Sequence, residues 1–147
     1  MVPAWLGAQI VPSSLLYKHH TWFSGILLLP DLLESIGTFA FNGCSGLVGP
    51  LTIPNLVTSI AYAAFYNCTG FNGILKIPNS VNSIGPVAFS SCYGFTEYYL
   101  YPTTAPNVEP NSFGSFAKPL HIKAGATGYN VAPWTNTSIF SSIIADL

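Results

Sequence analysis

A 24-residue pattern of hydrophobic and polar positions repeats three times without a gap, from Gly25 to Thr96. The copies read GILLLPDLLESIGTFAFNGCSGLV, GPLTIPNLVTSIAYAAFYNCTGFN and GILKIPNSVNSIGPVAFSSCYGFT. The recurrent positions hold Pro30/Pro54/Pro78, Ile36/Ile60/Ile84, Phe41/Phe65/Phe89, Cys44/Cys68/Cys92 and Gly46/Gly70/Gly94. A repeat of this length predicts a solenoid, in which each coil buries its hydrophobic side chains against the neighbouring coils.

Each copy predicts two extended segments and a corner. Leu51 and Ile53 alternate with a polar residue, as in a strand with one inward face, and Pro54 ends that strand because it cannot donate to a ladder. Further inward side chains are expected from the second segment and the return corner, namely Val57, Ile60, Ala64, Phe65 and Cys68. Stacked coils then form continuous sheets and internal columns of like side chains.

The pattern continues in a weaker form beyond Thr96. A fourth copy from Glu97 keeps three of the recurrent positions and carries an aromatic residue at the cysteine position, as Pro102, Val108, Phe113 and Phe116. A fifth copy, shortened by three residues, retains a Leu-x-Ile strand at Leu120 and Ile122. The predicted organisation is an eroded N-terminal coil or cap over 1–24, repeats over 25–48, 49–72, 73–96 and 97–117, a partial repeat over 118–123 and a C-terminal cap over 124–147.

The segment IPNSVNSIGPVAFSSC, from Ile77 to Cys92, closely resembles the BspA-like class of leucine-rich repeat, whose consensus is approximately IPxSVTxIGxxAFxxC. The resemblance covers residues 25 to about 123. It implies a right-handed leucine-rich-repeat solenoid, predominantly β, with short parallel strands in 24-residue coils. It also implies a surface-exposed or secreted protein that adheres to or binds host or partner proteins, and it does not imply catalysis. No cofactor is expected.

The composition limits the function classes. Hydrophobic residues make up 50% of the 147-residue chain and charged residues only 6%, with a net charge of −1. Nucleic-acid binding is not expected, because it needs a concentrated basic face and the four lysines are scattered. The longest apolar run, from Gly25 to Leu33, is interrupted by Pro30 and Asp31 and is far too short for a transmembrane helix. No basic segment of a signal peptide precedes the apolar N-terminal residues.

Three groups of residues could carry chemistry. The three equally spaced cysteines could form a metal site or disulfides, but a stacked column of buried thiols is favoured, since free cysteine packs as a small hydrophobe. His19 and His20 are adjacent and lack the spacing and carboxylate partner of a metal motif, so a surface or cap role is favoured. The acidic residues form no triad or carboxylate pair by spacing, and no enzyme is predicted.

The middle residues of the Leu-x-Ile strands predict the partner-binding face. They point outward between inward neighbours and are expected side by side as Leu28, Thr52, Lys76, Leu100 and His121, with His121 facing solvent. Tyrosines enrich the C-terminal end of this face, as at many interfaces, although Tyr99 and Tyr101 fall at the Leu and Ile positions and are expected in the core.

Two functions remain open. The first is a non-enzymatic extracellular or cell-surface recognition or adhesion module that binds a protein or glycan partner through the strand face. The alternative is a structural protomer that assembles with itself into a fibre or sheet through open solenoid ends or faces, since repeat proteins need capped ends to stay soluble.

Overall fold

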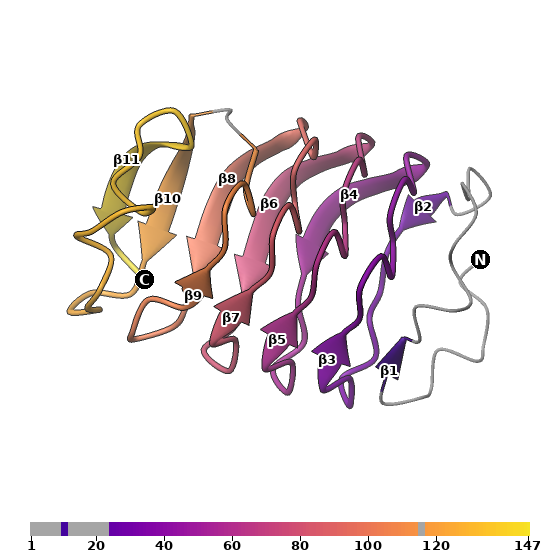
Figure 1. The fold of residues 1–147 in the computed structure, drawn as a ribbon, viewed down its shortest axis with the longest axis horizontal. Helices are drawn as coiled ribbons and strands as arrows, with labels where there is room; N and C mark the ends of the chain where they lie inside the picture. The colour runs from indigo at the N-terminus through magenta and orange to yellow at the C-terminus, as the bar shows by residue number, and fades with distance from the viewer. Residues whose placement is uncertain (1–9, 12–23, 115–116) are drawn as a thin grey trace.

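The computed structural model describes residues 10–11, 24–114 and 117–147, with only the main chain for 10–11. Over these residues the chain forms a parallel β-solenoid without helices, and from β2 to β9 successive strands alternate between two sheets (Figure 1). The last two strands, β10 and β11, both belong to the larger sheet. The predicted leucine-rich-repeat solenoid is confirmed. The described part contains no helix that is long and apolar enough to cross a membrane.

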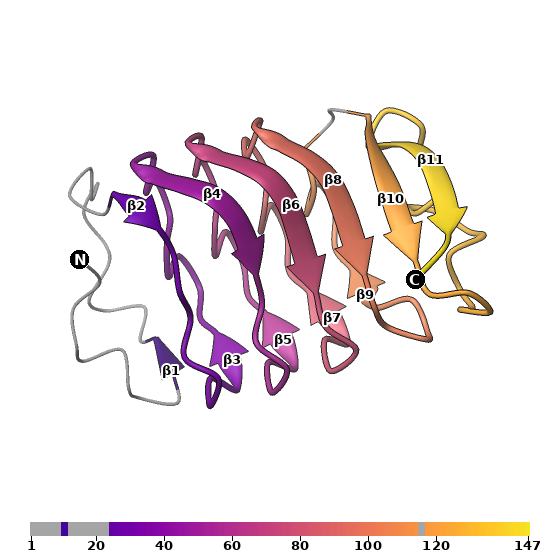
Figure 2. The same ribbon diagram turned by 180° about the vertical axis from the view of Figure 1, so that it is seen from behind.

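Two parallel sheets run the length of the solenoid. The larger is ordered β11-β10-β8-β6-β4-β2 and forms the broad face in Figure 2. Its strands are β2 (Gly25–Ile26), β4 (Leu47–Thr52), β6 (Phe71–Ile77), β8 (Phe95–Leu100), β10 (Lys118–Ile122) and β11 (Phe140–Ala145). The smaller is ordered β1-β3-β5-β7-β9, with strands β1 (Ile10–Val11), β3 (Ser35–Ile36), β5 (Ser59–Ile60), β7 (Ser83–Ile84) and β9 (Asn107–Val108).

The core consists of columns of like residues from successive coils, as the repeat predicts. Phe41, Phe65, Phe89 and Phe113 form one column, with centroids 5.1, 5.3 and 5.6 Å apart between successive rings. All the rings in this column are stacked nearly parallel to their neighbours. Phe113, in the weaker fourth copy, thus takes the predicted phenylalanine position.

The return corner explains the recurrent cysteines and glycines. The three cysteines are buried and free, as predicted. The Cys68 thiol donates to the carbonyl oxygen of Phe41, one coil earlier, at 2.9 Å. A Cβ at Gly94 would lie 2.0 Å from the carbonyl oxygen of Phe71, so the main chains of adjacent coils can approach this closely only at glycine. Phe116, the aromatic at the fourth cysteine position, lies outside the described residues.

The fourth coil departs from the predicted register. Three residues separate the buried Phe71 and Leu75 in β6, whereas two separate Phe95 and Tyr98 in β8, and Leu75 pairs with Tyr98. In β6 this interval contains Gly73, which has a φ of 94° and lies at a bulge where the register shifts. The interval in β8 is one residue shorter. An extra residue after β8 then restores the 24-residue spacing, so that Ser83 pairs with Asn107 and Ile84 with Val108.

This shift corrects three predictions. Leu100, expected on the outer row, pairs with Ile77 and is fully buried at 0% exposure. Tyr99, expected in the core, is partly exposed and pairs with Lys76. Tyr101 is the extra residue and is also only partly buried, because it follows the strand rather than lying within it. Tyr98 supplies the buried side chain instead.

The last coil closes the core with aromatic side chains. Tyr129, Trp134 and Phe140 are buried, and the Trp134 and Phe140 rings stack with centroids 5.6 Å apart. The Tyr129 hydroxyl donates to the carbonyl oxygen of Pro102 at 3.2 Å. Strand β11 pairs along β10 and forms the last strand of the larger sheet. The predicted eroded coil over 1–24 lies almost entirely outside the described residues.

Candidate partner-binding face

The outward side of the larger sheet carries a continuous row of side chains. Thr52 pairs with Lys76, Lys76 with Tyr99, Tyr99 with His121, and His121 with Ile144. Neighbouring parallel strands lie about 4.8 Å apart, so these residues form a ladder across β4 to β11. We call these five residues the outer row.

The structure brings together three of the five residues that the sequence predicted for this face, namely Thr52, Lys76 and His121. Leu100 is replaced by Tyr99 for the reason given above. Leu28 is 75% exposed but lies beyond the end of β2, outside the paired part of the sheet. One sequence feature could have indicated that Tyr99 belongs to the outer row. Glu97 stands where the earlier copies have a glycine of positive φ, so the fourth copy departs from the repeat just before Tyr99.

His121 lies among carboxylates from both neighbouring strands. Its Nδ1 is 3.0 and 3.1 Å from the two carboxylate oxygens of Asp146, and its Nε2 is 3.6 Å from Oε2 of Glu97. The Tyr99 ring covers it at a centroid distance of 4.4 Å. Only 11% of the His121 side chain is exposed, so the prediction that it faces solvent is wrong. These contacts join three successive strands.

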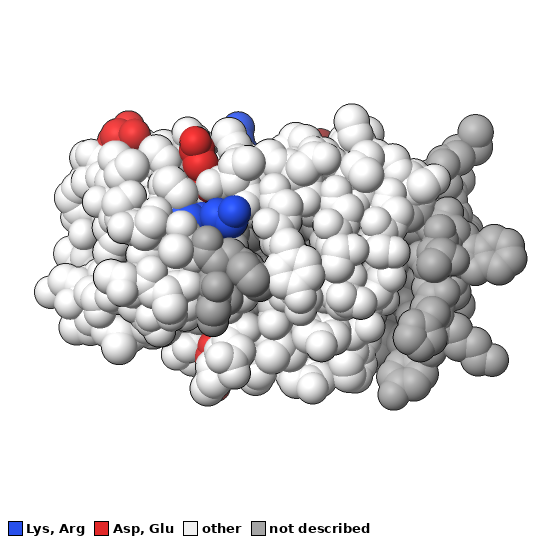
Figure 3. Space-filling view, turned by 90° about the horizontal axis from the view of Figure 1, so that it is seen from above, with Lys and Arg blue, Asp and Glu red and all other residues white. Residues whose placement is uncertain are grey.

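The charges of this face are separated into two groups. The Glu97 carboxylate, by a hydrogen bond and by its charge, raises the pKa of the Tyr99 hydroxyl. Glu97 and Asp146 both face His121, whereas Lys76 has no ion pair with any described residue. Figure 3, which views the solenoid from above, shows a side that is mostly uncharged, with its few acidic and basic side chains gathered over the C-terminal half. The ammonium group of Lys76 is therefore available to a partner, whereas the carboxylates of Glu97 and Asp146 are already paired with His121.

A hollow of about 330 Å³ adjoins the outer row where the strands of the larger sheet end. Its lining comes from five successive coils and consists of Thr52, Ile53, Asn55, Lys76, Pro78, Asn79, Tyr101, Lys123 and Leu147. We call it the strand-end hollow. It contains two lysines and two asparagines and no acidic side chain.

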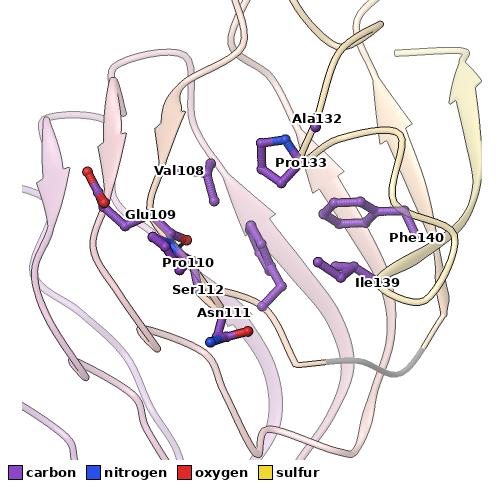
Figure 4. Close-up of a pocket in the computed structure, with 10 residues that line it drawn as sticks. Val108, Glu109, Pro110, Asn111, Ser112, Ala132, Pro133, Ile139 and Phe140 are labelled. Carbon is purple, nitrogen blue, oxygen red and sulfur yellow. Dashed lines mark hydrogen bonds between the residues drawn. The ribbon is translucent and has the colours of Figure 1, made fainter.

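A second hollow, of about 300 Å³, lies between the fourth coil and the C-terminal residues (Figure 4). Val108 and Pro110 lie on one side of it, with Pro133, Ile139 and Phe140 on the other. Its buried hydroxyl, Ser112, lies 2.6 to 3.2 Å from the main-chain carbonyl oxygens of Glu109, Gly85 and Ile84, and its one O–H is therefore already taken up by main-chain acceptors. The lining is thus mainly apolar and offers few free polar groups for recognition.

The other candidate chemistry is not brought together. The part of the chain that the structure describes has no group of three or more His, Cys, Asp and Glu side chains placed to hold a metal ion. Burial raises the pKa of the Cys44 thiol to about 11, and that of Cys68 also well above its usual value, so these thiols are poor nucleophiles at neutral pH. His19 and His20 lie outside the described residues.

Comparison with known proteins identifies the repeat. Residues 20–132 match the family model described as BspA type Leucine rich repeat region, in six copies. A search of the curated proteins gave no match. The family model covers well over half of the 147 residues, and the matched range includes strands β2 to β10.

Proposed function

The chain belongs to the BspA-type leucine-rich repeat family, and from this we propose that it is a non-enzymatic recognition or adhesion module of the cell surface or the extracellular space. Leucine-rich repeats of this kind typically serve as protein-interaction scaffolds, and the family is usually surface-exposed or secreted. The proposed partner is a protein or a glycan, bound on the outer row.

The alignment of the outer row carries this proposal. Thr52, Lys76 and Tyr99 stand on adjacent strands and offer a hydroxyl, an ammonium and an aromatic ring. Tyrosine is enriched at interfaces because it combines a large apolar area with a polar tip. The inward columns make the sheet rigid, so the row is held in place before a partner arrives, which lowers the entropic cost of binding.

The test is a binding screen with variants on two sides of the solenoid. The purified chain is probed against a glycan array and a panel of extracellular-matrix proteins, and each hit is repeated with Thr52→Arg and Tyr99→Ala. The matched control is Thr58→Arg, an exposed threonine of the same coil beside β5 of the smaller sheet. We expect the outer-row variants to lose binding and the control to retain it. Hits that all three variants retain, or no hits at all, would overturn the proposal.

Self-assembly is a second candidate function, favoured by the outer edge of β11, with which no strand of the described residues pairs. This strand is the last of the larger sheet, and Ile143 and Ile144 are 39% and 37% exposed on it. An unprotected edge strand is a template for pairing with another chain. Light scattering after size-exclusion chromatography tests it: assemblies that grow with concentration and disappear in Ile144→Lys support self-assembly, and a monomer at all concentrations contradicts it.

A further inference from the structure

We propose that the strand-end hollow is a subsite for an acidic oligosaccharide, whose carboxylates are bound by Lys76 and Lys123. This inference rests on the proposed recognition function and names the chemistry of its partner. It follows from the charges, polar groups and shape of the hollow.

The two lysines supply more positive charge than the described part of the chain offsets in the hollow. Lys76 lies in β6 and Lys123 directly after β10, and neither forms an ion pair with a described residue. The nearest acids on the face, Glu97 and Asp146, are turned to His121. In a chain with only 6% charged residues, two lysines line this hollow together with one negative group, the main-chain carboxylate of Leu147, which accepts the Ala124 N–H at 3.2 Å. The lining keeps a net positive charge, which favours an anionic ligand.

The asparagines supply groups suited to hydroxyls. Asn55 and Asn79 occupy the same position in successive repeats and both line the hollow. Asn79 accepts a hydrogen bond from the main-chain N–H of Thr103 at 3.1 Å through Oδ1, which fixes its amide and leaves Nδ2 to donate outward. Amides and the Thr52 hydroxyl can both donate and accept, as sugar hydroxyls do.

The shape of the hollow favours an extended chain. Its lining runs from the end of β4 to Leu147, two residues after β11, a distance of four strand spacings or about 19 Å. An extended peptide is usually bound by adding a strand to a sheet edge, but the hollow crosses strand ends, where side chains rather than a free edge are presented. The partly exposed Tyr101 adds apolar surface against which a sugar ring can pack.

Calorimetric titration of the full chain with three probes tests the inference. The probes are a galacturonic acid tetramer, a glucose tetramer and a tetraglutamate peptide. We expect only the galacturonic acid tetramer to bind, with an affinity that falls as salt rises. Lys76→Met and Lys123→Met should each weaken binding by about tenfold, the effect of one lost charge-assisted hydrogen bond.

The matched control is Lys118→Met, which removes the same charge from the other end of β10 and should leave binding unchanged. Because Lys123 lines the hollow without belonging to the outer row, its variant isolates the hollow, whereas Tyr99→Ala isolates the row. A ligand that no longer binds Tyr99→Ala but still binds Lys123→Met would overturn the proposal for the strand-end hollow and would leave the proposed function intact. Equal binding of glucose or tetraglutamate, or equal losses with Lys118→Met, would also overturn it.

Discussion

Cys92 donates its thiol to the main-chain carbonyl oxygen of Phe65, one coil earlier, at 3.0 Å. The same carbonyl accepts the N–H of Cys68, so a side chain of one coil completes the corner of the coil before it. The Cys68 thiol makes the equivalent bond to Phe41 at 2.9 Å. The cysteine column therefore links successive coils by hydrogen bonds as well as by packing, without disulfides.

We expect Cys92→Ala to lower the free energy of unfolding by about 1–3 kcal/mol, since it removes one hydrogen bond and leaves a small cavity in a fully packed corner. Cys92→Ser keeps a donor in place and should cost less than Cys92→Ala. Urea denaturation followed by tryptophan fluorescence measures both. A serine variant that is less stable than the alanine variant would show that the thiol serves only as apolar volume.

Alkaline pH should destabilise the fold through the buried thiols. Burial raises the pKa of Cys44 from 9.0 to about 11, so the unfolded chain loses this proton first and unfolding becomes easier as pH rises from about 9 to 11. Two pH units correspond to about 3 kcal/mol for this group. Burial also raises the pKa of Tyr98 and Tyr129, with the same sign.

Urea unfolding at pH 8, 9.5 and 11 measures this loss. Cys44→Ala is the matched variant: we expect it to be less stable than the parent at pH 8 but to lose less stability between pH 9 and pH 11. Parallel losses in the two proteins would contradict the assignment to Cys44.

A second stability prediction concerns main-chain strain at Val87. This residue has a φ of 50°, a left-handed conformation that is unfavourable for a β-branched side chain. The equivalent residue of the next coil is Asn111, with a φ of 58°, and asparagine tolerates this conformation well. Since Val87 is only partly buried, we expect Val87→Asn to raise the free energy of unfolding by about 1 kcal/mol.

The control for this substitution is Thr96→Asn in β8, an exposed residue that lacks a positive φ. It should give no gain in a thermal melt. If Val87→Asn melts below the parent, the apolar contacts of the valine outweigh the relief of strain.

The repeat made most of the fold predictable from the sequence. Inward positions such as Leu51, Ile60 and Phe65 recur every 24 residues, and each is buried against its equivalents. A periodic pattern is informative because every coil must meet the same packing demands as its neighbours.

The fourth coil was predicted wrongly because two irregularities cancel. One residue is lost before Tyr98 and one is gained at Tyr101, so the interval between Pro78 and Pro102 remains 24 residues. Spacing cannot detect such a pair, and a shift of one residue in a strand reverses the side on which every side chain lies. That is why Leu100 and Tyr99 exchanged places in the candidate site.

The contacts around His121 were not predictable either. Asp146 approaches it from β11 only because the last strand pairs with β10 at a register offset of 23 residues, which differs from the repeat. No spacing rule connects Glu97, His121 and Asp146, because the two coils that join β8 to β10 and β10 to β11 do not have the 24-residue length of the repeat.

The bond between His121 and Asp146 should stabilise the attachment of β11, the edge strand of the larger sheet. Both Asp146 oxygens lie within 3.1 Å of Nδ1, and the His121 side chain is largely covered, although Asp146 is about half exposed. For such a pair we expect a coupling energy of about 1 kcal/mol from a double-mutant cycle of His121→Ala and Asp146→Ala. Hydrogen exchange of the β11 amides should also accelerate in both single variants, because the strand opens more easily at the edge.

The matched cycle of His121→Ala with Glu97→Ala, whose carboxylate is 3.6 Å from Nε2, should give a smaller coupling. A coupling near zero at Asp146, or unchanged exchange in β11, would show that main-chain pairing alone holds the last strand.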